Sequence, residues 1–286
     1  MRMLTDPAAL QADCLDRRAR GQRIGFVPTM GFLHRGHLSL MALARARCDH
    51  LVVSIYVNPL QFGPTEDLAA YPRDPQGDAE RCREAGVDLL FAPTELYAPG
   101  HATSVRVAGL TEGLCGRSRP THFEGVTTVV ARLFGLVQPT LAVFGEKDYQ
   151  QLAVIRRMSA DLALPIEILG GALVRDEDGV ALSSRNAYLT PEQRLRARSL
   201  SASLRALRAA FDQGERDVPT LLQLARAQLQ VDRLDYLEIV DAASLAPLSV
   251  VDRPARALIA AWVGSPRLLD NIALNNSALD PTALDG

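Results

Sequence analysis

The alternation of two hydrophobic periodicities is the feature that most constrains this fold. Short apolar runs typical of buried strands alternate with longer segments whose apolar residues recur at helical spacing. The strand-like runs are 23–27, 51–57, 88–91, 140–144 and 166–169, and the main helical segments are 37–48, 74–85, 125–137 and 147–162. Strands joined by helical crossovers pair in parallel. We therefore predict an α/β N-terminal domain, residues 1–173, built on a parallel sheet.

The pattern changes at about residue 174. Segments 191–213 and 218–230 are rich in Arg and Leu and have the spacing of amphipathic helices, and 234–240 and 257–263 are strand candidates. This order predicts a smaller α+β domain over residues 174–286. We expect the tail, 275–286, to be mobile.

The composition is that of an ordinary globular protein, and it argues against several classes. The chain is 48% hydrophobic and 22% charged. Its net charge is −2, so it has no excess of positive charge of the kind that attracts nucleic acid. No run of about 18 apolar residues and no signal-peptide core is present. The cysteines contain no C-x-x-C pair and indicate neither a zinc ribbon nor a disulfide framework: Cys14, Cys48, Cys82 and Cys115. We expect a cytoplasmic protein without a membrane or nucleic-acid partner.

The first candidate site is PTMGFLHRGH, residues 28–37, which follows a predicted strand. Ligands of parallel sheets bind at the carboxyl ends of the strands. A helix that opens near Gly36 would offer orphan backbone N–H groups to an anion, and His34 and His37, one turn apart, would face the same ligand. A zinc pair is an alternative, but it needs further ligands and the other histidines are isolated. A capped helix start without function is the other alternative.

The second candidate is NPLQFGPTEDLAAYPRD, residues 58–74, directly after the strand-like run 51–57. Asn58 and Gln61 carry amides, which both donate and accept hydrogen bonds and so suit a neutral, hydroxyl-bearing substrate. The alternative is turn chemistry for Asn58 and surface solvation for Gln61.

The third candidate is FGEKDYQQ, residues 144–151, at another strand-to-helix transition. Lys147 is the single lysine among 31 basic residues, and a compact ammonium is not interchangeable with guanidinium between phosphates. Asp148 could reach a ribose, and Gln151 lies one helical turn after Lys147 on the same face. The alternatives are chance survival of the lysine and a glycine-led helix start with an acid in its first turn.

The fourth candidate is VRDEDGVALSSRN, residues 174–186. Two hydroxyls and a guanidinium follow the turn 177–179, which is the composition of a mobile loop that grips an anion. The alternative is a surface hairpin.

Together these stretches resemble the pantothenate synthetase (pantoate–beta-alanine ligase) family over about residues 20–275. PTMGFLHRGH is similar to the HIGH motif of Rossmann-like nucleotidyl-transferring enzymes, and SIYVNPLQFGPTEDLAAYPR, HFEGVTTVVARLF, FGEKDYQQL and LSSRNAYL are similar to the family's other signatures. LSSRN stands where class I aminoacyl-tRNA synthetases carry a lysine-rich phosphate loop. The chain departs from the pattern at Arg35, where many members are acidic, and at Leu182, where some have Met. Neither side chain supplies chemistry in the family.

The resemblance implies a ligase of pantothenate and coenzyme A synthesis. Pantoate carboxylate attacks the α-phosphate of ATP, which gives pantoyl adenylate and pyrophosphate, and beta-alanine then displaces AMP. The resemblance also implies Mg²⁺ bound through the ATP phosphates without a direct protein ligand, a Rossmann-like N-terminal domain, a C-terminal domain that covers the site, and a homodimer formed through the N-terminal domain.

The resemblance further assigns roles to individual residues. His34, His37 and Lys147 are expected to be catalytic, with the histidines neutralising phosphate charge and His37 as the proton donor. Pantoate is expected at Gln61 and Gln151 with Asn58 nearby, and beta-alanine at Gln61. Backbone at Met30, Gly145 and Val174 is expected to hold the nucleoside. The full expected ATP site is Met30, Gly31, Phe32, Leu33, His34, Arg35, Gly36, His37, Gly145, Glu146, Lys147, Asp148, Val174, Leu182, Ser183, Ser184 and Arg185.

Two other classes of function remain open at this point. A small-molecule nucleotidylyltransferase would stop at the adenylated product. A nucleotide-binding regulator could keep the fold without catalysis, but loss of His37 or Lys147 would be its sign, and both are present. A tRNA synthetase is disfavoured, since no anticodon-binding extension and no basic balance is visible.

Overall fold

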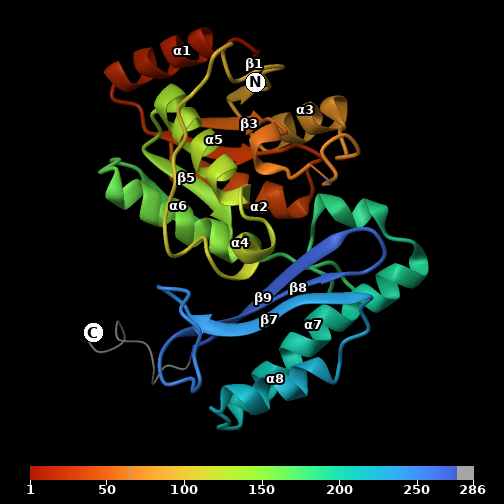
Figure 1. Ribbon diagram of the computed structural model, residues 1–286. Helices are drawn as coiled ribbons and strands as arrows, with labels where there is room; N and C mark the ends of the chain where they lie inside the picture. The colour runs from red at the N-terminus through yellow and green to blue at the C-terminus, as the bar shows by residue number, and fades with distance from the viewer. Residues whose placement is uncertain (65, 276–286) are drawn as a thin grey trace. The chain divides into compact units, whose positions relative to one another are not determined.

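The computed structural model describes residues 1–64 and 66–275, and the chain divides into two compact units (Figure 1). Unit 1 comprises Met1–Glu112 and Arg119–Leu173, and unit 2 comprises Gly113–Ser118 and the chain from Val174. The short segment Gly113–Ser118 thus belongs to unit 2 although both its neighbours in sequence belong to unit 1. All but the first residue of the predicted mobile tail lies outside the described residues.

Unit 1 is built on a six-stranded sheet in which every pair is parallel, with the order β1-β4-β3-β2-β5-β6. The strands are β1 (Arg2–Leu4), β2 (Ile24–Thr29), β3 (His50–Ile55), β4 (Leu89–Phe91), β5 (Leu141–Gly145) and β6 (Glu167–Gly171). From β2 the chain builds outward to β3 and β4 on one side, and it then returns to add β5 and β6 on the other. The strand order therefore reverses between β2 and β5, where ligands of such sheets bind.

Helices cover both faces of this sheet (Figure 1). The helices are α1 (Pro7–Ala19), α2 (Arg35–Arg45), α3 (Pro75–Glu84), α5 (His122–Val137) and α6 (Tyr149–Asp161). One face packs on α2 and α3 through a cluster that contains Val27, Met41 and Ala79. On the opposite face, Phe134 of α5 meets Phe26 and Phe144 edge-on, with ring centroids 6.4 and 6.3 Å apart. The predicted α/β class is confirmed.

Some element boundaries differ from the predictions. β1 and α1 were not predicted, and β2 continues through Pro28 to Thr29 where the strand was expected to end. Proline removes one donor from a ladder but keeps its carbonyl, and the Thr29 carbonyl still accepts from Tyr56 N at 3.0 Å. Pairing with β3 therefore extends the strand to Thr29, two residues before Gly31 of the following turn.

Unit 2 is a three-stranded antiparallel sheet with helices packed on it. Its elements are β7 (Arg233–Asp241), β8 (Ala255–Trp262), β9 (Arg267–Leu274), α7 (Pro191–Asp212), α8 (Val218–Arg226) and the short α4 (Leu114–Ser118). Leu237 and Ile239 of β7 join the core under α7 and α8, whereas the alternate residue Tyr236 meets Cys115 of α4. The predicted α+β character is confirmed, and β9 is a strand that the sequence reading missed.

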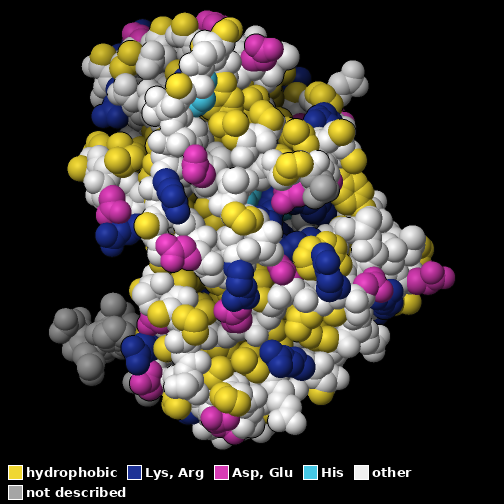
Figure 2. Space-filling model, in the orientation of Figure 1, with side chains coloured by type: hydrophobic (Ala, Val, Ile, Leu, Met, Phe, Trp, Pro, Cys, Tyr) yellow, Lys and Arg dark blue, Asp and Glu magenta, His cyan; other side chains and the backbone are white. Residues whose placement is uncertain are grey.

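The surface carries both charge signs side by side. On the face shown in Figure 2, basic and acidic side chains are interspersed and form no large patch of one sign. Within the described part of the chain, no helix combines the length and the apolar character that crossing a bilayer requires.

Candidate active site

Two turns lie at the point where the strand order reverses. We call residues 29–37, which follow β2, the histidine turn, and residues 145–148, which follow β5, the lysine turn. β2 and β5 pair directly, with Phe26 opposite Ala142. The two turns consequently leave the same carboxyl edge of the sheet from neighbouring strands, as the sequence reading expected.

The first half of the histidine turn uses its backbone donors inside the protein. Gly31 N donates to Thr29 Oγ1 at 3.2 Å. Phe32 N and Leu33 N donate to the two carboxylate oxygens of Asp78 at 2.8 and 2.7 Å. These three N–H groups are therefore bound within the protein. The orphan groups predicted from the sequence belong to the next residues, where the helix opens near Gly36.

The second half of the turn is capped by the two histidines. His34 N donates to His37 Nδ1, and Gly36 N donates to His34 Nδ1, each at 3.2 Å. This is a reciprocal capping box in which imidazole nitrogens replace the usual hydroxyl and carboxylate acceptors. A neutral imidazole that accepts at Nδ1 carries its proton on Nε2. Both rings, whose centroids lie 4.0 Å apart, therefore present Nε2–H donors away from the backbone.

The electrostatics of this turn favour neutral imidazoles. Burial, assisted by the Lys147 ammonium, lowers the pKa of His34 to about 4. Burial, His34 and Lys147 together lower the pKa of His37 to about 3. Both rings are neutral at neutral pH, so they would meet a phosphate as oriented hydrogen-bond donors, and the approach of that phosphate would raise both pKa values.

The lysine turn contributes charge with little local capping. Gly145 leads into a short 3-10 helix, η2 (Glu146–Asp148), and Tyr149 then begins α6. No side-chain hydrogen bond caps η2 or α6. The Lys147 side chain is 20% exposed and its Nζ lies 3.5 Å from Asp148 Oδ2. The ammonium is close enough to His34 and His37 to contribute to the lowered pKa of both rings.

The amide pair after β3 is more ordered than the sequence suggested. Gln61 ends a 3-10 turn, η1 (Pro59–Gln61), and Asn58 caps it. Asn58 Nδ2 donates to Gln61 Oε1 at 3.1 Å and to the Gly125 carbonyl at 3.0 Å. With its oxygen occupied, Gln61 turns its Nε2 toward Met30 Sδ, 3.3 Å away, which places that donor beside the histidine turn.

Several residues that support Gln61 were missed in the sequence. Tyr97 Oη donates to Asn58 Oδ1 at 2.9 Å, and the Gln61 carbonyl lies 2.9 Å from His122 Nδ1 and accepts from Arg119 Nη2 at 3.2 Å. Only glycine fits at position 125, because a Cβ there would stand 2.3 Å from the Leu60 carbonyl oxygen. The other contacts have no local signal, because they join positions about 40 to 60 apart in the chain.

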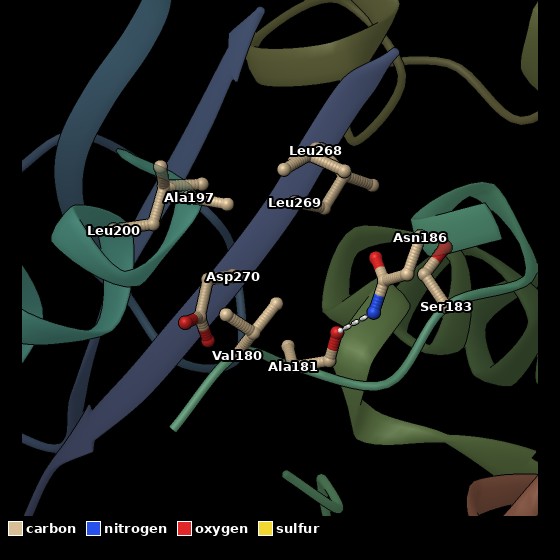
Figure 3. A pocket seen from close by; sticks show the side chains of 9 residues that line it. All are labelled: Val180, Ala181, Ser183, Asn186, Ala197, Leu200, Leu268, Leu269 and Asp270. Carbon is tan, nitrogen blue, oxygen red and sulfur yellow. Dashed lines mark hydrogen bonds between the residues drawn. The ribbon is translucent and has the colours of Figure 1, made fainter. Parts of the chain in front are cut away.

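The LSSRN segment belongs to unit 2 and forms a tight turn. Ser183 caps the 3-10 helix η3 (Ser184–Tyr188) by accepting from Arg185 N at 3.3 Å. Asn186 Nδ2 donates to the Ala181 carbonyl at 3.0 Å beside a small cavity of unit 2 (Figure 3). Leu182 N donates to the Val174 carbonyl at 3.0 Å, which closes the hairpin. The phosphate contacts expected of this segment stay predictions.

The described residues offer no ready metal cage. Across 1–64 and 66–275, no group of three or more His, Cys, Asp and Glu side chains is arranged to hold a metal ion. His34 and His37 commit their Nδ1 atoms to capping, and His50 lies at the start of β3, at the opposite edge of the sheet.

Comparison with known proteins identifies the family of this chain. The family model described as pantoate-beta-alanine ligase matches residues 2–273. The chain belongs to this family. A pantothenate synthetase from Syntrophotalea carbinolica is 51% identical over 95% of this chain and 98% of its own length. The resemblance indicated by the sequence motifs is confirmed.

Solved structures of the family share the fold. The crystal structure of a pantothenate synthetase from Thermus thermophilus matches with a TM-score of 0.92 at 48% identity, covering 96% of this chain and 100% of that one. A pantoate–beta-alanine ligase from Francisella tularensis, complexed with beta-gamma ATP and beta-alanine, matches with a TM-score of 0.79 at 30% identity, covering 96% and 98%.

Proposed function

We propose that this enzyme condenses pantoate with beta-alanine at the expense of ATP and forms pantothenate through pantoyl adenylate. Family membership supports the reaction, as does the relative whose structure is a complex with beta-gamma ATP and beta-alanine. The observation that carries the proposal is the pairing of turns at the strand reversal. Two oriented imidazole donors and a lysine ammonium converge there, which suits the phosphates of a nucleotide.

The first step is a displacement at phosphorus. A pantoate carboxylate oxygen bonds to the α-phosphorus, the bond from that phosphorus to the bridging oxygen breaks, and pyrophosphate leaves with the electron pair. Such a transfer needs alignment and charge stabilisation more than a protein nucleophile. We assign Lys147 to the developing negative charge and His34 and His37 to hydrogen bonds from Nε2. His37 acts as a proton donor to the phosphates only after their approach has raised its pKa and the ring has gained a proton.

The second step is acyl transfer. The amine of beta-alanine bonds to the acyl carbon, AMP leaves with its phosphate oxygen, and the amine loses a proton. We assign Gln61 and Gln151 to the pantoate hydroxyls and carboxylate, and Gln61 also to beta-alanine. Asn58 has its amide occupied within the protein, so we assign it to fixing the Gln61 amide, which its contacts support.

The remaining assignments concern ATP and Mg²⁺. We propose that the nucleoside lies against backbone at Met30, Gly145 and Val174 with Asp148 at the ribose, and that Ser183, Ser184 and Arg185 hold the outgoing phosphates. Mg²⁺ would enter on the ATP phosphates and neutralise part of their charge.

Exchange of labelled pyrophosphate into ATP tests the proposal. We expect exchange that requires pantoate but not beta-alanine, with pantothenate and AMP appearing in equal amounts once beta-alanine is added. A panel of other hydroxy acids serves as the control. Exchange with every acid, or a stable adenylate that beta-alanine does not consume, would favour a nucleotidylyltransferase. A protein that binds ATP but supports no exchange would be a regulator.

We also propose that the enzyme is a cytoplasmic homodimer, as the family resemblance implies. Light scattering at micromolar concentration should give about twice the chain mass of 31.0 kDa. A species of the chain mass alone would contradict the dimer.

A further inference from the structure

A buried carboxylate stands behind the histidine turn and has no part in the chemistry assigned above. Asp78 lies in the first turn of α3 and is 1% exposed. Its Oδ2 accepts from Phe32 N at 2.8 Å and its Oδ1 accepts from Leu33 N at 2.7 Å. Arg81 of the same helix approaches Oδ1 only to 3.8 Å. The backbone of the turn is therefore the main hydrogen-bonding partner of this carboxylate.

The backbone that Asp78 holds is in an uncommon conformation. Gly31 has φ of 83° and Phe32 has φ of 51°, so two successive residues lie in the left-handed region. Glycine enters that region freely, but a residue with a Cβ does so at a cost in free energy and needs surrounding contacts to keep it there. A Cβ at Gly31 would also lie 3.0 Å from Asp78 Oδ2, so the carboxylate and the turn fit closely.

This bend sets the entry of the chain into α2. Phe32 and Leu33 directly precede His34, the N-cap whose ring accepts from Gly36 N and whose own N–H donates to His37. A change in the bend would rotate the N-cap and break the exchange of hydrogen bonds that fixes both imidazole tautomers. The orientation of the Nε2–H donors of His34 and His37 thus depends on the conformation of residues 31–33, which Asp78 holds.

We propose that Asp78 is a positioning residue for the phosphate-binding histidines: its carboxylate holds residues 31–33 in the left-handed bend that orients His34 and His37. The inference rests on the proposed function only for the meaning of that orientation. Packing α3 against the sheet needs no charge, and an apolar side chain would avoid the cost of burying one. The hydrogen bonds that Asp78 accepts from Phe32 N and Leu33 N offset part of this cost, although burial still raises the pKa of its carboxyl.

The test replaces the carboxylate with a near-isosteric amide. Asp78→Asn keeps one oxygen but places an NH₂ group against the second N–H, so the bend should loosen. Glu80→Gln makes the same chemical change at an exposed position of the same helix and is the matched control. With histidine-selective ¹⁵N and ¹³C labelling, the five rings report their tautomers by NMR.

We expect Asp78→Asn to shift His34 and His37 from the Nε2–H tautomer toward a mixture, while the other rings keep their signals. Single-turnover formation of pantoyl adenylate should slow by roughly 10- to 100-fold, since misalignment of about an ångström has effects of that size. Glu80→Gln should match the wild type in both readouts. Phe32→Gly, which removes the cost of the left-handed conformation, should restore part of the tautomer signal in the Asp78→Asn background.

A purely structural role predicts a different outcome. If Asp78→Asn lowers the melting temperature but leaves the His34 and His37 signals and the adenylate rate unchanged, the proposal is overturned. A slower rate with unchanged ring signals overturns it as well. Asp78→Glu, which keeps the charge and moves it by one methylene, decides the question by the same readouts should the amide variant fail to fold.

The design separates this inference from the proposed function. If the wild-type protein shows no pantoate-dependent exchange, the function is wrong, but the NMR arm still tests whether Asp78 sets the tautomers. If the wild-type exchange requires pantoate and the His34 and His37 signals do not change in Asp78→Asn, the proposed function is supported and the positioning role of Asp78 is wrong.

Discussion

The histidine turn and the lysine turn leave neighbouring strands of one sheet, yet they are built in opposite ways. In the histidine turn the N–H groups of residues 31–34 and of Gly36 are bound within the protein, and the two rings are held neutral by burial. The lysine turn has no side-chain cap, and its functional group is a partly exposed ammonium.

The difference indicates a division of labour between direction and charge. A rigid, neutral donor can be aimed at one phosphate oxygen, but it does little to offset a net negative charge. A lysine offsets charge but is a point charge on a flexible stem. Stabilising phosphoryl transfer requires both properties. The predictions below test whether the two turns really differ in this manner.

The largest effect is expected at the lysine turn. Lys147→Arg keeps the charge but moves it by about an ångström and widens it, which should slow single-turnover formation of pantoyl adenylate on the order of 10²-fold. Lys147→Ala should cost at least as much, because it removes the charge altogether.

Thermal melting is the control for both lysine variants. Neither should change folding much, because Lys147 lies in a turn and not in the core. A folded Lys147→Arg protein with the wild-type rate would mean that Lys147 has no catalytic role and is present by chance. The phosphate contacts of unit 1 would then be assigned to the histidine turn.

A smaller effect is expected at the amides that flank the two turns. Gln61 presents its Nε2 beside Met30, so Gln61→Ala should leave a pantoate hydroxyl unpaired at a cost of about 1–3 kcal/mol. The pantoate requirement should rise far more than the ATP requirement. Gln151→Ala, on the α6 side, is the matched comparison in steady-state kinetics. Equal losses for both substrates would place Gln61 outside the pantoate site.

The neutral state of the histidine turn has a consequence for stability against pH. The pKa of His37 is about 3 in the folded protein and near its ordinary 6.5 in the unfolded chain. The unfolded chain therefore binds more protons between these values, and the free energy of unfolding falls as pH drops below 6.5 toward 3. The slope from this residue approaches about 1.4 kcal/mol per pH unit.

His37→Gln should flatten that dependence. Gln is a common residue at this capping position and does not titrate, so the helix start should survive. Denaturant titrations at about pH 7, 6 and 5 measure the slope. His34 and His122, whose pKa values are both lowered to about 4, contribute to the slope of both proteins, so the difference between the slopes reports His37. An unchanged slope would mean that His37 is already protonated in the native state, and the contrast with Lys147 would disappear.

The smallest effect is expected in the loop 62–74. We expect it to order over the labile adenylate, which excludes water from the site. Part of the loop is already held, since Glu66 pairs with Arg119 and the Tyr71 ring lies 5.9 Å from Phe62. Hydrogen exchange should therefore slow only modestly with pantoate and a non-hydrolysable ATP analogue together. Unchanged exchange would contradict closure by this loop.

Sequence reasoning predicted the sheet well and the site only in part. The parallel strands followed from short, uniformly apolar runs. β1 and β9 mix polar and apolar residues, so they do not stand out. The turns after β2 and β5 were predicted because parallel topology brings strand ends together. The capping role of the imidazoles was not predicted, since hydrogen-bond direction depends on backbone geometry.

The contacts that hold the site together could not be predicted from local sequence patterns. Asp78 is one of several polar residues of a predicted helix, and its partners are about 45 positions away. His122 was judged isolated, yet its ring meets the Gln61 carbonyl. Such pairings arise from tertiary packing and leave no periodic trace in a single sequence.

The segment Gly113–Ser118 bears on how the chain is made. It docks on β7 through Cys115 and Tyr236, 3.2 Å apart, and through Ser118 Oγ, which donates to Asp235 at 2.7 Å. A ribosome makes this segment well before it makes β7, so during synthesis α4 cannot dock until β7 has been made. Cutting the chain between residues 173 and 174 would leave α4 on the first fragment and its docking strand on the second. Two fragments made separately would therefore carry complementary surfaces for reassembly.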